Sequence, residues 1–542
     1  MTAPHPGRLL AGGPILTMAG GPAPEAIAVR DARIVAVGAL EECRAALGGD
    51  REELDLAGRT LLPGFVDAHC HPVMLGQTWS WVDVSPAVTP TIRDLQAVLR
   101  RRAEELPAGA PLYAFGYNHR RLRERRHPTA ADLDAVAADR TIYVMNQSGH
   151  GGVLNRFGLR AHGITADTPD VPGGEIGRDA SGHPTGLVMD AACDLLTGPG
   201  GVKIGNHGPN LHLPSPPEQL DEFLATAQRA MLSNGITTAV DAQVTRRELE
   251  TYRRALAGGR LKIRVGLRIL SAFVDDLLTL GLTGGLGGPL LDVVGVKLYA
   301  DGALGGWTAW FPCGYHCDPA NHGLLYHTPE AFAELLGRCH RAGLRTGTHA
   351  QSPDAIAMVL DAIEAAVETD GGRPVEHTIE HCGLVGDADV ARMLGLGVRP
   401  VFQPAHHFLF GDGVLQAVGE ELGARYNPAG LFDRRGMLPA LSSDGPVADP
   451  VPLQAIQAAV ERHTIGGEEL GGAELALDVA TALRGHTLAG ARVAGREHEV
   501  GTLEPGKLAD LVVLAEDPTA VEVARLAEIE VSETWVGGER VA

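Results

Sequence analysis

Residues 63–72 read PGFVDAHCHP, a short apolar run that carries two histidines, His69 and His71, two positions apart. The composition of residues 64–70 favours a β-strand, and side chains alternate along a strand. His69 and His71 would therefore face the same side and could chelate a metal ion together. A single pair of this kind is a weak signal, because chance or packing explains it about half the time.

Seven further strand-like runs follow, at residues 237–242, 262–269, 293–300, 344–350, 376–382, 399–405 and 438–444. Helix-like runs lie between most of them, as at residues 217–233, 330–342, 354–368 and 387–396. Strands that alternate with helices form a parallel sheet, and eight such repeats predict a closed α/β barrel of the (β/α)₈, or TIM, type.

Residues 71–236 separate the first strand from the second, which is far longer than an ordinary connection between a strand and a helix. We interpret the stretch from about 73 to 213 as an inserted subdomain. It leaves the C-terminal end of the first strand, where barrel enzymes keep their active sites. The insertion should therefore cover the site and shape the substrate pocket.

Both ends of the chain are rich in β-branched residues and turn signals. Chain termini often lie close together in a fold. We therefore predict a small β-sandwich domain formed by residues 1–63 and 491–542. The metal-dependent barrel would then occupy residues 64–490.

The composition excludes several classes of protein. The chain has 542 residues and a formal net charge of −21, whereas a nucleic-acid-binding protein needs a large basic face. Its seven cysteines lack paired spacing, so we expect no disulfide framework and a cytoplasmic location. No secretory signal pattern or membrane-spanning run is present. We expect a small-molecule substrate, no nucleic-acid or membrane partner, and leave a homodimer open.

The only dense basic stretch is RRLRERR at residues 120–126. Charge runs of this length usually lie on a solvated surface. We interpret it as a solvated helix or a local salt-bridge patch in preference to an anion-binding site.

Four more predicted strands carry residues that can bind a metal ion: Lys297, His349, His381 and Asp444. Each of these alone is more often structural than catalytic, and a buried lysine could simply form an ion pair. Together with His69, however, they bring five strands to the same rim with a ligand-type side chain. That coincidence indicates a metal site at the barrel mouth.

The motifs also resemble a known family. PGFVDAHCHP (63–72), VKLYADGALGG (296–306), THA (348–350), IEHC (379–382), SSDGPVADP (442–450) and VGTLEPGKLADLVVL (500–514) are similar to those of the amidohydrolase superfamily. Their order and spacing most resemble its amidohydrolase-3 (YtcJ-like) branch, which includes N-substituted formamide deformylase. The segment PGGEIGRDASGHPTG (172–186) resembles the inserted segment of that branch.

The resemblance implies a role for each ligand candidate. His69, His71 and Asp444 would hold a first divalent metal ion, and His349 and His381 a second. Lys297 would be carbamylated by CO₂ and bridge the two. The donor set suits zinc best, although manganese, iron or nickel would also fit, and one or two ions could bind. Asp444 would also move protons, and His150 would contact substrate; His119, His127, His406 and His407 are interpreted as bystanders.

We therefore predict a metal-dependent hydrolase that cleaves a non-peptide, amide-type C–N bond through a metal-activated hydroxide. Ester hydrolysis, decarboxylation or isomerisation on the same site are the alternatives. A non-catalytic binding relative is also open, but such proteins usually lose ligands and none is lost here.

Overall fold

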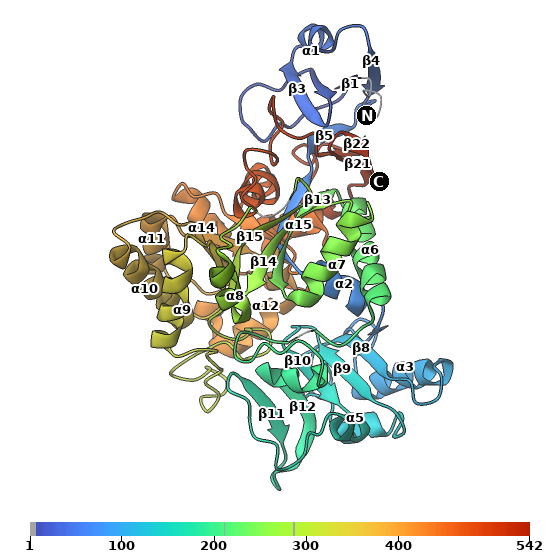
Figure 1. Cartoon of the computed structure of the whole chain (residues 1–542), viewed down its shortest axis with the longest axis vertical. Helices are drawn as coiled ribbons and strands as arrows, with labels where there is room; N and C mark the ends of the chain where they lie inside the picture. The colour runs from blue at the N-terminus through green and yellow to red at the C-terminus, as the bar shows by residue number, and fades with distance from the viewer. Residues whose placement is uncertain (1–6, 211, 286–287) are drawn as a thin grey trace.

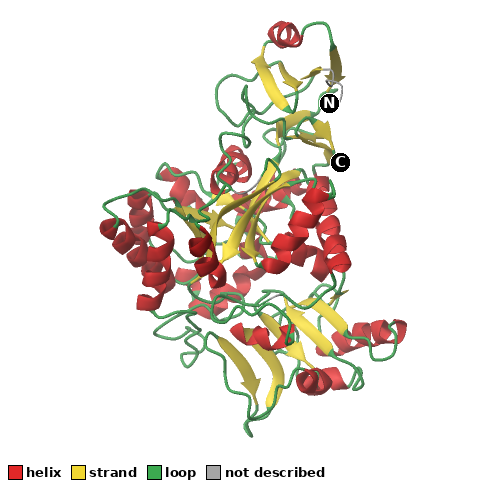
Figure 2. Ribbon diagram, in the orientation of Figure 1, coloured by secondary structure: helices red, strands yellow, loops and turns green. Residues whose placement is uncertain are grey.

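The computed structural model describes residues 7–210, 212–285 and 288–542. Three parts follow one another along the long axis of the molecule (Figure 1). Two small sheets from both chain ends lie at one end, a barrel ringed by helices lies in the middle, and a subdomain rich in strands lies at the other end (Figure 2).

The central sheet has eight strands, and every neighbouring pair in it is parallel. Its strands, in spatial and chain order, are β6 (Phe65–Cys70), β13 (Ile236–Val244), β14 (Arg264–Leu270), β15 (Leu291–Tyr299), β16 (Thr346–Ala350), β17 (His377–His381), β18 (Arg399–Phe402) and β19 (Ala440–Leu441). Each strand coincides with one of the eight predicted from the sequence. The TIM-type barrel is thereby confirmed.

Backbone hydrogen bonds close the barrel between its first and last strands. The Asp444 N–H donates to the His69 carbonyl at 2.8 Å, and the His71 N–H donates to the Gly445 carbonyl at 2.9 Å. The predicted eighth strand, 438–444, is regular only at Ala440–Leu441. Three residues beyond its end, Asp444 adopts φ +59°, a left-handed conformation that turns the chain away from an extended course.

Helices cover the outside of the barrel: α2 (Pro72–Trp79), α6 (Pro217–Ser233), α7 (Arg246–Ala257), α8 (Val274–Leu280), α9 (Pro329–Arg341), α10 (Pro353–Thr369), α11 (Asp387–Leu396), α12 (Pro404–Val418), α13 (Glu420–Gly423), α14 (Ala429–Arg434), α15 (Pro452–Glu461), α16 (Val479–Arg484) and α17 (Gly490–Val493). In α10, Ile356, Val359 and Ile363 recur at helical spacing and are all buried. They belong to the same apolar core as Ile379 of β17, so periodic apolar residues fix the helix against the strands.

The stretch between β6 and β13 contains its own six-stranded sheet, in the order β11-β12-β10-β9-β8-β7. Its strands are β7 (Val82–Asp83), β8 (Leu112–Tyr117), β9 (Ile142–Asn146), β10 (Gly151–Leu154), β11 (Gly174–Arg178) and β12 (Pro184–Asp190). The helices α3 (Ile92–Glu105), α4 (Ala130–Asp134) and α5 (Arg156–Ala161) belong to the same part of the chain. A separate subdomain thus follows the first barrel strand.

Two four-stranded sheets lie near the chain ends, ordered β3-β2-β1-β4 and β22-β21-β20-β5. The first is formed by N-terminal strands, and the second joins the N-terminal β5 to three C-terminal strands. Their strands are β1 (Gly7–Ala11), β2 (Ala26–Arg30), β3 (Arg33–Gly38), β4 (Arg51–Asp55), β5 (Thr60–Pro63), β20 (Leu511–Leu514), β21 (Val531–Val536) and β22 (Glu539–Arg540), with helix α1 (Leu40–Leu47) beside the first sheet. One apolar core, which includes Ile27, Val29, Leu511 and Trp535, joins the two sheets into a small sandwich. The exact domain boundaries stay a prediction.

The helix prediction for the basic run 120–126 is wrong. Residues 119–126 form turns, and Arg125 adopts φ +52°. Within the residues that the structure describes, the salt-bridge interpretation applies only to Arg126, which pairs with Asp132 at 2.7 Å. In the described part of the chain, no helix is long and apolar enough to cross a membrane.

A buried ion pair fastens the barrel to the sandwich. Arg264, the first residue of β14, donates from Nε and Nη2 to the two carboxylate oxygens of Asp510 at 2.6 and 2.8 Å. Asp510 is 3% exposed, and the Gly537 N–H also donates to it. Loss of the carboxylate would leave a buried guanidinium without a counter-charge.

We therefore expect Asp510→Ala to lower the free energy of unfolding by about 3–5 kcal/mol. Urea titration and the melting temperature measure the effect. Asp361→Ala is the matched control, because the Asp361 side chain is 72% exposed although it pairs with Arg392 at 2.6 Å. That control should lose no more than about 1 kcal/mol. Equal losses in both variants would contradict a special role for the buried pair.

Candidate metal centre at the barrel mouth

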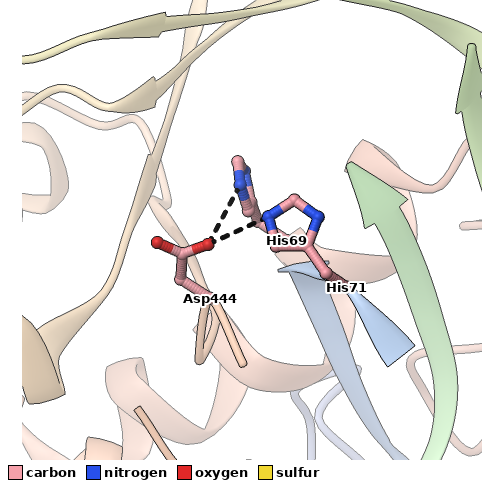
Figure 3. A group of neighbouring side chains, drawn as sticks. All are labelled: His69, His71 and Asp444. Atoms are coloured by element: carbon pink, nitrogen blue, oxygen red, sulfur yellow. Dashed lines mark ion pairs between the residues drawn. The ribbon is translucent and has the colours of Figure 1, made fainter. Parts of the chain in front are cut away.

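Asp444 lies at the barrel mouth, where its two carboxylate oxygens face ring nitrogens of four histidines. Oδ1 is 3.4 Å from His69 Nε2 and 3.3 Å from His71 Nε2 (Figure 3). Oδ2 is 4.0 Å from His381 Nδ1 and 3.6 Å from His406 Nε2. The left-handed turn at Asp444 places the carboxylate there.

The strand that carries His69 is anchored to the segment that carries Asp444. Asp67, on the same strand face, accepts hydrogen bonds from the Ser443 N–H at 3.0 Å and the Ser443 hydroxyl at 2.5 Å. Asp67 is fully buried and takes no direct part in the ligand cluster. It holds His69 and Asp444 in register, as expected for a structural group.

A second carboxylate orients His69 from behind. The Nδ1 atom of His69 lies 2.5 Å from Glu380 Oε2. Glu380 in turn accepts hydrogen bonds from the Arg268 guanidinium and the Thr378 hydroxyl. A carboxylate on one ring nitrogen fixes the tautomer and leaves the other nitrogen, Nε2, directed into the site.

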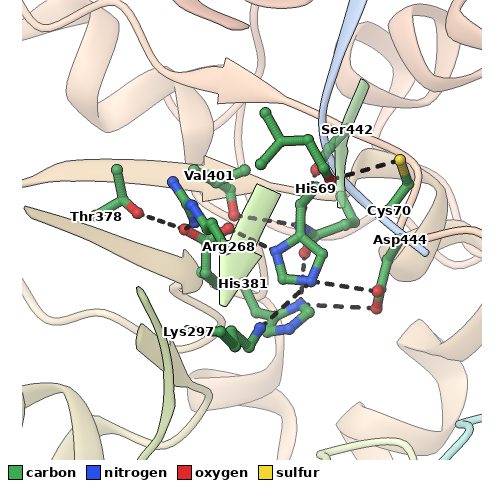
Figure 4. A network of polar contacts seen from close by, with 12 residues as sticks. His69, Cys70, Arg268, Lys297, Thr378, His381, Val401, Ser442 and Asp444 are labelled. Atoms are coloured by element: carbon green, nitrogen blue, oxygen red, sulfur yellow. Dashed lines mark hydrogen bonds and ion pairs between the residues drawn. The ribbon is translucent and has the colours of Figure 1, made fainter. Parts of the chain in front are cut away.

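Lys297 and His381 complete the inner wall of the mouth. The Lys297 Nζ atom is fully buried and lies 3.5 Å from His69 Nε2 (Figure 4). The His381 Nδ1 atom bonds to Gln403 Oε1 at 2.7 Å, which again leaves the opposite ring nitrogen free. His381 adopts φ +67°, and such strained backbone concentrates at functional sites.

His349 lies next to His381, with their ring centroids 4.4 Å apart. Its Nε2 atom bonds to the Gly302 carbonyl at 3.1 Å, so Nδ1 is the nitrogen left for a ligand. Its ring also stacks on that of Tyr299, at a centroid distance of 5.1 Å. The structure thus brings all six predicted ligand candidates to one face of the barrel.

His150 reaches this face from the inserted subdomain, and its ring centroid lies 5.5 Å from that of His349. Its Nδ1 atom is 2.7 Å from Asp190 Oδ1, which also accepts the Tyr326 hydroxyl at 2.6 Å. The insertion therefore contributes a fixed histidine to the rim of the barrel, and its role as a substrate contact stays a prediction.

Sequence reasoning set His406 aside, but the structure places it in the cluster. His381, His406 and Asp444 offer ligand atoms that all lie within 4.8 Å of one another, as do His69, His71 and Asp444. Among the residues that the structure describes, the buried His406 Nε2 atom has no hydrogen-bond partner. The signal was present in QPAHH at residues 403–407, directly after the seventh strand.

The sequence pattern of the amidohydrolase family matches residues 52–542. The chain belongs to the amidohydrolase family. It is 31% identical to N-substituted formamide deformylase of Arthrobacter pascens, over 95% of this chain and 94% of that protein. It is also 30% identical to the putative amidohydrolase YtcJ of Bacillus subtilis (strain 168), over 95% and 96% of the two chains.

A solved structure of similar fold is that of an uncharacterized metal-dependent hydrolase from Pyrococcus horikoshii OT3. It has a TM-score of 0.76 and 25% sequence identity, and the match covers 96% of this chain and 99% of that one. The predicted resemblance is confirmed. This amidohydrolase is accordingly an enzyme of a metal-dependent class that acts on C–N bonds.

The pKa values at the mouth of this amidohydrolase follow from burial and from two carboxylates. Burial lowers the pKa of His69 to about 4 and that of His381 well below its ordinary value. Burial also lowers the pKa of His71, but Asp241 and Asp444 outweigh it and raise the value to about 9. His69 and His381 are therefore neutral at pH 7, as ligands must be, whereas His71 holds a proton that a cation would displace.

The residues present fit a divalent cation. Two groups of two histidines and one aspartate share Asp444, and all their members are buried. In both His69 and His381 the Nδ1 atom is held by a hydrogen-bonding partner, which directs Nε2 into the site. In the described part of the chain, the buried His406 Nε2 atom has no hydrogen-bond partner. Imidazole nitrogens together with a carboxylate oxygen form a donor set typical of zinc.

Proposed function

We propose that this amidohydrolase hydrolyses the amide-type C–N bond of a small molecule, with N-substituted formamides as the substrate class. The observation that carries the proposal is the position of Asp444, whose two oxygens lie between the His69–His71 pair and the His381–His406 pair. The substrate class is supported by the 31% identity to N-substituted formamide deformylase over nearly the whole chain.

Zinc is the proposed ion, with His69, His71 and Asp444 as one set of ligands and Lys297, His349 and His381 as the other. His406 is a further candidate ligand, because it shares Asp444 with His381. A divalent cation held by these donors would lower the pKa of water from ~15.7 towards neutrality and polarise a carbonyl oxygen.

Lys297 is proposed to carry a carbamate derived from CO₂. Only an uncharged amine can react with CO₂, and burial lowers the pKa of Lys297 to about 8. In the described part of the chain, Lys297 has no carboxylate within 4.0 Å that would hold it as a cation. The carbamate is an anion with two oxygens, which lysine itself cannot offer.

Asp444 is proposed to transfer the protons. Burial raises the pKa of its carboxyl group, but the surrounding histidines outweigh this and hold it well below the usual range. The carboxylate is therefore ionised at pH 7 and can accept the proton of the attacking water. It can then donate this proton to the leaving nitrogen, which departs as an amine while formate is released.

The inserted subdomain is proposed to select the substrate. His150 enters the mouth from that subdomain, and Asp190 and Tyr326 fix its position. In this fold the reacting residues lie at the ends of the barrel strands, whereas the loops that cover the barrel mouth vary freely and can select the substrate.

The direct test uses N-hexylformamide and its ester counterpart, hexyl formate, with product analysis by NMR. We expect hexylamine and formate from N-hexylformamide, and no turnover in a His69→Ala/His71→Ala double variant that controls for contaminating enzymes. Hydrolysis of the ester alone, after correction for its spontaneous reaction, would assign the site to ester substrates instead.

A further inference from the structure

A cavity of about 500 Å³ opens between the loop that follows β8 and helix α12. Three arginines of the basic run, Arg120, Arg121 and Arg125, line it together with Asn118. Leu409 and Phe410 of α12 form an apolar part of its wall. The cavity thus combines an apolar surface with three guanidinium groups.

None of these three arginines forms an ion pair within 4.0 Å in the part of the chain that the structure describes. The neighbouring Arg126 does, with Asp132. Most arginines of a chain with a net charge of −21 should find a carboxylate easily. Three unpaired arginines on one cavity therefore concentrate positive charge that an anion can neutralise.

Two acidic residues close to these arginines, Glu124 in the basic run and Asp412 in the cavity wall, are occupied elsewhere. Glu124, the only acid within the basic run, accepts the Ile92 N–H at 3.1 Å and so lies at the first turn of α3. Asp412 lines the cavity, but it accepts the Thr464 hydroxyl at 2.5 Å and the Gly466 N–H at 3.1 Å. In the described structure, neither carboxylate lies within 4.0 Å of the guanidinium of a cavity arginine.

Arg120 is held in place without a counter-ion. Its guanidinium carbon lies 3.3 Å from the ring centroid of Trp307, a cation–π contact. Its Nε atom is buried and has no hydrogen-bond partner within residues 7–210, 212–285 and 288–542. Burial lowers the pKa of Arg120 from its ordinary value by more than the neighbouring Asp318 raises it. The positive charge at this position is therefore fixed before any ligand binds.

The cavity lies close to the reacting groups. The ring of Phe410, which lines it, contacts the ring of His406 at a centroid distance of 5.4 Å. His406 in turn lies 3.6 Å from Asp444. A substrate whose amide lies at Asp444 could therefore extend past Phe410 and end among the arginines.

We propose that this cavity is a substrate subsite for a carboxylate group, separated by an apolar spacer from the bond that is hydrolysed. The inference rests on the proposed function for the identity of the reacting bond. Arginine binds carboxylates through two parallel hydrogen bonds, so Arg121 and Arg125 at the cavity edge and Arg120 deeper in it suit such a group.

The test compares N-formyl-6-aminohexanoate with the neutral N-hexylformamide on the Arg121→Gln/Arg125→Gln double variant. We expect the ratio of kcat/KM for the anionic over the neutral substrate to exceed one in the unaltered enzyme. In the double variant this ratio should fall by about tenfold, mainly through KM, because hydrogen bonds to charged groups are lost. Arg123→Gln is the matched control, since Arg123 lies exposed in the same loop but does not line the cavity.

A ratio that is unchanged in the double variant, or that falls equally in Arg123→Gln, would overturn the subsite. If neither formamide is hydrolysed, the proposed function fails, and calorimetry still decides on the subsite. Hexanoate should bind the unaltered protein more tightly than hexanamide does, and the double variant should lose that difference. Hexanoate held at the metal centre would bind both proteins equally, which would also overturn the inference.

Discussion

Asp444→Asn is expected to lower kcat by about 10²–10⁴-fold while the fold and most of the bound metal are retained. Asparagine has the same shape as aspartate and keeps one oxygen that can bind a metal ion beside His69 and His71. Its neutral amide cannot accept a proton from water. The loss falls on kcat because proton transfer occurs in the reaction and contributes nothing to substrate binding.

The alternative is that Asp444 only stabilises the turn after β19, as aspartates often do. In the described residues, however, its carboxylate faces imidazole nitrogens, and no backbone N–H donates to it. The turn itself uses the Asp444 carbonyl, which accepts the Val447 N–H at 2.9 Å. Asparagine at position 444 should leave that backbone bond intact.

The measurement combines kcat, metal content and melting temperature on one preparation. Asp194→Asn is the matched control for an aspartate with a purely structural role. The Asp194 carboxylate accepts hydrogen bonds from the N–H groups of Ile204 at 3.1 Å and Gly205 at 2.8 Å. That control should melt earlier with normal kcat. If Asp444→Asn behaves in the same way, the carboxylate has no part in proton transfer.

The barrel and its rim could be predicted from the sequence because both depend on local periodicity. Strand alternation places His69 and Asp67 on one face, and the order of strands brings His381 and Asp444 to the same end. Equivalent strand ends meet in a closed parallel barrel whatever the long connections contain. Local sequence patterns were therefore enough to predict that six of the side chains lie at the barrel mouth.

Contacts between distant segments could not be predicted in this way. His406 and His407 are adjacent in sequence, yet His406 faces Asp444 while His407 Nε2 bonds to the Ala458 carbonyl at 2.8 Å. Helical geometry sends neighbours in different directions, and the sequence does not say which faces the mouth. The ion pairs of the basic run 120–126 were unpredictable for the same reason. Glu124, its one acid, bonds to the Ile92 N–H at the start of α3, a contact between distant segments that the local sequence does not reveal.

Removal of divalent metal by chelation and dialysis is expected to abolish turnover. Without a cation, His406 Nε2 lacks a partner and His71 keeps a proton, so the mouth cannot activate water. Zinc or manganese should restore activity, whereas calcium should not, because it prefers oxygen ligands. Calcium is therefore the matched control for a non-specific effect of ionic charge.

The same experiment has a pH dependence whose direction follows from His71. Its pKa of about 9 in the metal-free protein means that a proton must leave before zinc can bind. Zinc affinity should therefore rise as the pH increases towards 9, and His71→Ala should reduce both the affinity and this slope.

Metal-loaded protein should also melt at a higher temperature, because the ion binds the folded state. Full turnover in protein shown to be metal-free would refute the metal centre and the role of every ligand assigned to it.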